Sequence, residues 1–75
     1  MAGKLPTLKA RQLMRVLHSL GFQPVRQVGS HIFYKHSDGR TTVIPRHDRE
    51  DIGKALLKEI LKDIHISPDE FMEHL

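Results

Sequence analysis

The chain has 75 residues, of which 39% are apolar and none is cysteine. This length is about half that of a typical domain, so we expect one compact unit over residues 1–75. The lack of cysteine excludes disulfide bonds, thiolate zinc sites and thiol nucleophiles. Because no apolar run exceeds three residues, the sequence offers neither a membrane span nor a signal-peptide core, and we expect a cytoplasmic protein.

The charge is divided unevenly along the chain. Residues 1–49 carry nine lysine or arginine residues against two aspartates, a net charge of +7. Residues 50–75 carry three lysines against seven acidic residues, a net charge of −4. This asymmetry predicts a polyanionic partner for the first two-thirds of the chain, or simply a solvated basic surface, and charge alone does not separate the two.

The first helix is predicted after a loose lead-in of residues 1–6. Thr7 is a suitable N-cap for this helix, and Gly21 stands where a C-terminal cap belongs. Between them, apolar residues recur at helical spacing: Ala10, Leu13, Met14, Leu17 and Leu20.

Three strand-like segments follow the first helix. Residues 22–28 predict a strand at the edge of a sheet, because Pro24 has no backbone N–H to donate to a neighbour. Gly29-Ser30 separates this segment from a second strand over residues 31–36, and residues 40–44 predict a third. Asp38-Gly39 is a strong signal for a two-residue hairpin loop between the last two strands.

A two-residue loop fixes which residues of the hairpin share a face. It places Phe33 opposite Ile44 and Tyr34 opposite Val43. Since both faces would carry apolar side chains, the alternation does not show which face is covered. One face would consist of His31, Phe33, Lys35, Thr42 and Ile44.

Two helices complete the chain. Lys54, Lys58 and Lys62 form a basic stripe on the exposed side of the first of them. The run Ser67-Pro68-Asp69-Glu70 combines a capping box with proline at the first helical position, which predicts a short last helix over residues 67–75. The order of elements predicts an α+β fold in which helices cover one face of a three-stranded antiparallel sheet. The apolar side of the longer helix is formed by Ile52, Leu56, Leu57, Ile60, Leu61 and Ile64.

Six histidines in 75 residues are the most distinctive chemical feature of the sequence. An imidazole with an unperturbed pKa near 6.5 can accept and donate a proton at neutral pH without a metal. A metal site is not expected, because His31 and His36 are five apart on a strand and project to opposite faces. No two histidines have the spacing of four that would bring them together on a helix. We therefore expect no metal and no cofactor.

His31 is the strongest catalytic candidate. It follows Gly29-Ser30, residues that allow a tight bend and a close approach of the backbone to a ligand. Such a bend would hold the imidazole at the start of a strand, on a rigid element that is open to solvent. Arg26 precedes the bend and Lys35 follows it, and both are able to bind phosphate. On spacing alone, an ordinary surface histidine at a strand end is the alternative.

One combination of residues is typical of a known family. The string Arg26-Gln27-Val28-Gly29-Ser30-His31, together with the later Pro45-Arg46-His47, resembles the HicA-type mRNA interferase toxins of bacterial toxin–antitoxin pairs. The resemblance covers roughly residues 5–70. Flanking segments that also fit are Leu20-Gly21-Phe22, Asp38-Gly39-Arg40, Val43-Ile44, Ile60-Leu61-Lys62-Asp63 and Ile66-Ser67.

The resemblance implies both a fold and an activity. The fold would be like that of the double-stranded-RNA-binding domain, with the order α-β-β-β-α. The activity would be metal-independent cleavage of mRNA, with His31 essential, and an antitoxin of the HicB type would cover the active site. Two positions depart from the family, which often has glycine at Ala55 and His65. Alanine is the better helix former, and histidine tolerates a left-handed helix end better than β-branched residues do.

With RNA as the substrate, each neighbouring group receives an expected role. His31 would act as general base or acid on the 2′-hydroxyl reaction, and Arg26 and Lys35 would contact the phosphate. The second proton carrier is left open, because His36, His47 and Tyr34 are each more ordinary as surface or structural residues. Further RNA contacts are expected at Gly29, Ser30, Arg46 and Lys58, and more loosely at Lys9, Arg11, Arg15, Arg40, Lys54 and Lys62.

Two functions of other classes compete with the ribonuclease. A non-catalytic RNA-binding module would keep the basic face but would not depend on His31. A DNA-binding or adaptor domain fits less well, because three strand-like segments separate the helices and no helix-turn-helix pair is recognisable.

Overall fold

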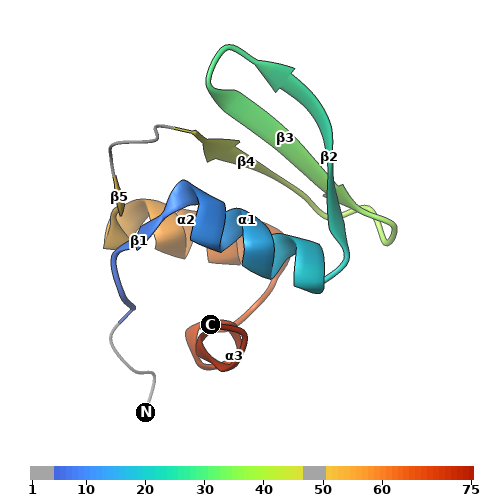
Figure 1. Ribbon diagram of the computed structural model, residues 1–75. Coiled ribbons are helices and arrows are strands. Elements are labelled where there is room, and N and C mark those ends of the chain that lie inside the picture. The colour runs from blue at the N-terminus through green and yellow to red at the C-terminus, as the bar shows by residue number, and fades with distance from the viewer. Residues whose placement is uncertain (1–4, 47–50) are drawn as a thin grey trace.

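A computed structural model describes residues 5–46 and 51–75. Three longer strands, β2, β3 and β4, form an antiparallel sheet in the order β2-β3-β4. Helices α1 and α2 lie together against one face of this sheet, and α3 packs beyond them (Figure 1). The elements in chain order are β1 (Leu8–Lys9), α1 (Ala10–Ser19), β2 (Phe22–Val28), β3 (His31–His36), β4 (Thr41–Pro45), β5 (Asp51–Ile52), α2 (Lys54–Ile64) and α3 (Pro68–Glu73).

This arrangement confirms the predicted α+β fold of the type α-β-β-β-α, with helices on one face of the sheet. The core fills the space between the helices and the covered face. No helix in the described ranges has the length and apolar character needed to cross a membrane. The most deeply buried side chains are Leu13, Leu17, Phe22, Tyr34, Ile44, Leu57, Ile60, Ile64 and Phe71.

A second, two-stranded sheet was not predicted. β1 pairs with β5, with Leu8 opposite Ile52, and Lys9 Nζ lies 2.7 Å from Asp51 Oδ1. Because this pairing holds the chain extended, α1 begins only at Ala10, and the N-cap is Lys9 instead of the predicted Thr7. For the same reason Ile52 belongs to β5 and α2 starts at Lys54.

The predicted register of the β3–β4 hairpin is wrong by one residue. The loop has three residues, Ser37 to Gly39, and is closed by a hydrogen bond from His36 N–H to the Arg40 carbonyl at 2.9 Å. Gly39 has φ of 100°, the left-handed geometry that a three-residue hairpin loop requires at this position. Tyr34 therefore pairs with Thr42.

The corrected register decides which face of the sheet is covered. Ile32, Tyr34, Thr42 and Ile44 are all buried and face the helices. Their strand neighbours on the other face are more exposed. Thr42 and Ile44 thus lie on the face opposite to His31, and not on its face as the two-residue loop predicted.

The ends of α2 and α3 follow the sequence signals. His65 adopts φ of 56° and ψ of 42°, so it takes the left-handed conformation expected at the end of α2. Ser67 is the N-cap of α3, its Oγ accepting a hydrogen bond from Glu70 N–H at 3.1 Å, and Pro68 is the first helical residue. Phe71 is the buried side chain of α3.

Arg40 connects the hairpin loop to the end of α2. Its Nε lies 2.8 Å from Asp38 Oδ2, its Nη1 donates to the Ile64 carbonyl at 2.5 Å, and its guanidinium lies 5.1 Å from the centre of the Phe22 ring. The hydrogen bonds from Arg40 also hold the pKa of Asp38 below its usual value. This arginine, considered above as a loose RNA contact, is therefore engaged in the fold.

Replacing Arg40 with alanine should destabilise the protein. The Ile64 carbonyl loses its charged donor, at an expected cost of about 1–3 kcal/mol, which lowers Tm by roughly 5–20 °C in a domain of this size. Thermal unfolding followed by circular dichroism measures the change. Lys58→Ala, an exposed residue in the middle of α2, is the matched control. Equal Tm values for the two variants would mean that the Arg40 contacts add nothing to stability.

Candidate active site

His31 lies on the face of the sheet that the helices leave uncovered. Side chains alternate along β3, so Ile32 and Tyr34 are buried towards the helices while His31 is exposed on the opposite side. Phe33 and Lys35 share the face of His31 by the same alternation. We refer to this surface, with its neighbours Arg26 and Val43, as the open face.

The turn before His31 is held from both sides. Val28 pairs with His31, so β2 and β3 are joined by the two residues Gly29 and Ser30. Gly29 has φ of 58°, a conformation that favours glycine, and the space where a side chain would stand is empty. Gln27 Nε2 donates to the Gly29 carbonyl at 2.9 Å, and Arg46 N–H donates to the Ser30 carbonyl at 2.6 Å. The backbone before His31 is therefore fixed by hydrogen bonds, and the space beside Gly29 is open.

Arg26 and Lys35 share the open face with His31. β2 has an irregularity at Val25, after which Arg26 pairs with Phe33. The Arg26 guanidinium lies 4.8 Å from the centre of the Phe33 ring, which fixes the cation over the sheet. Lys35 is exposed and four residues from His31, roughly 13 Å along the strand. His31 therefore lies at the end of the open face next to the turn, and Arg26 and then Lys35 lie farther from the turn on the same face.

The remaining predicted contacts divide into two groups. Gly29, Ser30 and the backbone of Arg46 lie directly beside His31, because Pro45, which precedes Arg46, pairs with His31 across β3 and β4. The side chain of Arg46, however, lies on the covered side of the sheet, with Ile32 and Tyr34. Lys58 does not lie beside His31. It is exposed on α2, which packs against the covered side of the sheet.

Two of the alternative proton carriers, His36 and Tyr34, are not on the open face. His36 packs its ring edge against Phe22 at 5.0 Å between centres, and its Nδ1 accepts a hydrogen bond from Asp38 N–H at 3.1 Å. Tyr34 is only 2% exposed, and burial raises the pKa of its hydroxyl, while the positive charge of Arg46 acts in the opposite direction. His47 lies outside the described residues.

Phe33 is a site residue to which the sequence reasoning assigned no role. It is partly exposed, lies two residues from His31 on the same face, and carries the Arg26 guanidinium on its ring. A partly exposed aromatic ring beside cations offers a stacking surface for a nucleobase. His31 and Phe33 are two residues apart on a strand, which indicates that they share a face. The sequence did not show, however, that this face is the open one.

The chemistry available on the open face is proton transfer next to bound phosphate. An exposed imidazole can exchange a proton at neutral pH, and neighbouring guanidinium and ammonium groups stabilise charge on phosphoryl oxygens. Within residues 5–46 and 51–75, no group of three or more histidine, aspartate or glutamate side chains is placed to hold a metal ion.

The chain was compared with known proteins. A family model described as the HicA toxin of bacterial toxin–antitoxin systems matches residues 10–66, from the start of α1 to just beyond the end of α2. A search of curated proteins gave no significant match. The matched range contains every residue of the candidate site.

Proposed function

The chain belongs to the HicA toxins of bacterial toxin–antitoxin systems, and we propose that it is an endoribonuclease that cleaves mRNA in the cytoplasm without a metal ion. The observation that carries the proposal is the placement of His31. Its imidazole is exposed at the rigid start of β3, on the open face that also carries Arg26 and Lys35. This is the arrangement that proton transfer on a bound polyanion requires.

The substrate supplies its own nucleophile. The 2′-hydroxyl oxygen of a ribose attacks the adjacent phosphorus, so that the O2′–P bond forms and the P–O5′ bond breaks. His31 takes the proton from the 2′-hydroxyl or gives one to the departing 5′ oxygen, a role that contributes about 10²–10⁴-fold to the rate. The products are a 2′,3′-cyclic phosphate and a 5′-hydroxyl end. His47 stays a candidate for the other proton transfer.

Binding rests on phosphate contacts in this proposal. Arg26 and Lys35 supply the positive charge on the open face, and the backbone at Gly29 and Ser30 leaves room for the strand to approach. Phe33 adds stacking for one base. Affinity should therefore fall as the salt concentration rises, because bound phosphates release counterions.

The family also implies an antitoxin partner for this chain. We propose that the partner is of the HicB type and covers the open face. A protein that covers this cationic surface should present acidic groups to it. In doing so it would occupy the place of the RNA backbone and shield His31 from the substrate.

The products of the reaction test the proposal. The purified protein, incubated with a single-stranded RNA in the presence of EDTA, should yield fragments that end in a 2′,3′-cyclic phosphate, identified by mass spectrometry. The same oligonucleotide with 2′-O-methyl riboses should stay intact, because its nucleophile is blocked. An RNA that is bound but never cut would favour the non-catalytic RNA-binding module instead.

A further inference from the structure

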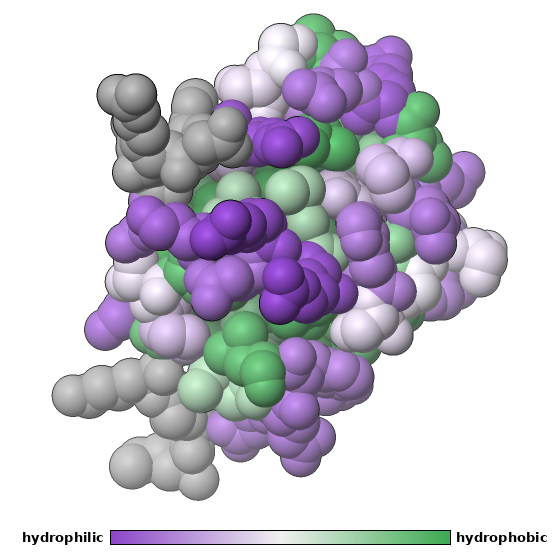
Figure 2. Space-filling view, viewed as in Figure 1, coloured by the Kyte–Doolittle hydropathy of each residue, from purple (hydrophilic) through white to green (hydrophobic). Residues whose placement is uncertain are grey.

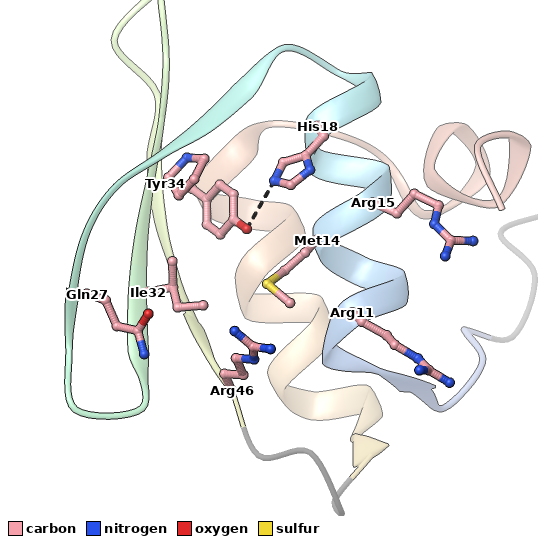
Figure 3. Close-up of a pocket in the computed structure, with 9 residues that line it drawn as sticks. Arg11, Met14, Arg15, His18, Gln27, Ile32, Tyr34 and Arg46 are labelled. Carbon is pink, nitrogen blue, oxygen red and sulfur yellow. Dashed lines mark hydrogen bonds between the residues drawn. The ribbon is translucent and has the colours of Figure 1, made fainter.

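A groove lies on the covered side of the sheet, directly behind the candidate active site. It has a volume of about 470 Å³ and runs between α1 and the β2–β3 hairpin. One wall is formed by Arg11, Met14, Arg15 and His18 of α1, and the other by residues of the sheet and by Arg46 (Figure 3). This volume is in the range of sites that hold small organic molecules.

The charged residues described in the lining of the groove are all arginines. Arg11 and Arg15 are one turn apart on α1 and exposed, and in Figure 3 their guanidinium groups are turned away from the floor of the groove. Arg46 enters from the end of β4 and points towards Met14. Among the residues that the structure describes, none that lines the groove is acidic. Guanidinium groups bind phosphate oxygens through paired hydrogen bonds, so this rim fits a phosphate group.

The interior of the groove is different in character from its rim. Met14 and Ile32 provide an apolar floor, and hydrophobic surface is visible between strongly hydrophilic side chains over α1 in Figure 2. At one end, His18 Nε2 lies 3.2 Å from the Tyr34 hydroxyl. Burial raises the pKa of Tyr34, and its hydroxyl is hydrogen-bonded to the His18 ring. An apolar floor with a polar end fits a base or ribose.

The groove and His31 lie on opposite faces of the sheet, at the same end of it. Ile32 follows His31 in β3 and faces the groove, while His31 faces the open side. Gln27 lines the groove and its side chain holds the Gly29 carbonyl. Arg46 also lines the groove, and its N–H holds the Ser30 carbonyl. A strand that passes around the Gly29-Ser30 turn therefore contacts both surfaces.

We propose that this groove binds a nucleotide of single-stranded RNA that adjoins the one cut at His31. Arg11 and Arg15 contact its phosphate, and the His18–Tyr34 pair contacts its base or ribose. The proposal rests on the proposed ribonuclease function, which supplies the substrate, but it assigns a binding surface on the opposite face of the sheet.

Binding of RNA to the uncut state tests the groove. The full chain with His31→Ala is titrated against a fluorescein-labelled single-stranded RNA, with anisotropy recorded at several salt concentrations. Arg11→Ala and Arg15→Ala, each added to this protein, should weaken binding about tenfold, the loss of one charge-assisted contact. Each should also reduce the slope of log K against log salt by about 0.7.

The matched control lowers the net charge of the protein by the same amount, but at the other end of the sheet. Ser37→Glu changes an exposed residue of the β3–β4 loop, and its affinity should stay within about twofold of the parent protein. Equal losses of RNA affinity in Ser37→Glu and in the arginine variants would show a general charge effect and would overturn the proposal that the groove binds RNA. So would unchanged RNA affinity in the double variant Arg11→Ala/Arg15→Ala with a native circular dichroism spectrum.

Further outcomes separate this proposal from the catalytic one. If the unsubstituted chain cuts RNA and Arg15→Ala raises KM without lowering kcat, both proposals are supported. If RNA is cut with the KM unchanged by Arg15→Ala, the ribonuclease stands and the groove does not. If no RNA is cut but the arginine variants lose affinity, the groove is an RNA site and catalysis at His31 is overturned. Weakened binding of the antitoxin alone would make the groove a protein-docking surface and overturn it as an RNA site.

Discussion

The His31→Ala protein should fold normally and lose its ability to cleave RNA. His31 is exposed and its side chain supports no core contact, so the expected change in unfolding free energy is below about 0.5 kcal/mol. Loss of a positioned general acid–base lowers the rate by about 10²–10⁴-fold. A single-turnover assay with excess enzyme measures this loss, and a thermal melt of the same sample verifies the fold.

His74→Ala is the matched control, because this histidine is also exposed but follows α3. It should cut RNA at the rate of the unsubstituted chain. Expression in bacteria gives a second readout: the unsubstituted chain and His74→Ala should arrest growth, and His31→Ala should not. Cleavage at full rate by His31→Ala would end the assignment of His31 as the catalytic residue.

Phe71→Ala should produce the largest loss of stability of the substitutions considered. Phe71 is 0% exposed and is the residue through which the described α3 joins the core. Truncating a fully buried phenylalanine costs about 3–5 kcal/mol. In a domain of this size, each kcal/mol lowers Tm by roughly 4–8 °C, so a shift of at least about 12 °C is expected by calorimetry or circular dichroism.

The neighbouring Met72 provides the comparison for Phe71. Its side chain is 40% exposed on the same helix, and Met72→Ala should change Tm by only a few degrees. α3 lies beyond the matched range of residues 10–66, so the two variants also show whether this last helix supports the part that carries the site. A Phe71→Ala protein as stable as Met72→Ala would mean that α3 does not contribute to the folded core.

Most of the fold could be predicted because its main signals are local. The apolar spacing of α1 and α2, Pro24 in an edge strand and the Ser67 cap each depend on a few neighbouring residues. The β1–β5 pair could not be predicted, because strands of two residues are too short to show an alternation of apolar and polar residues. The hairpin register failed because Asp38-Gly39 is compatible with loops of two or three residues, and one residue exchanges the two faces.

The candidate site depended on both kinds of information. Gly29-Ser30 indicated a bend that presents His31, and this local prediction agrees with the turn. The open face required the register, which is a tertiary property, and so Phe33 received no role. The groove combines Arg11 and Arg15 of α1 with Arg46, which lies far from them in sequence. The sequence identified each arginine as a basic residue but did not show that the three line one groove.

The irregular path of β2 restricts how any other chain can approach this molecule. β2 is an edge of the sheet, but Pro24 has no N–H to offer, and the change of register at Val25 interrupts the even spacing of backbone groups. A foreign strand therefore finds no continuous ladder there, and self-association into longer sheets is disfavoured along this side. Recognition of β2 must come through the side chains that it displays, which at this edge favours partners that lie across the strand over partners that extend the sheet.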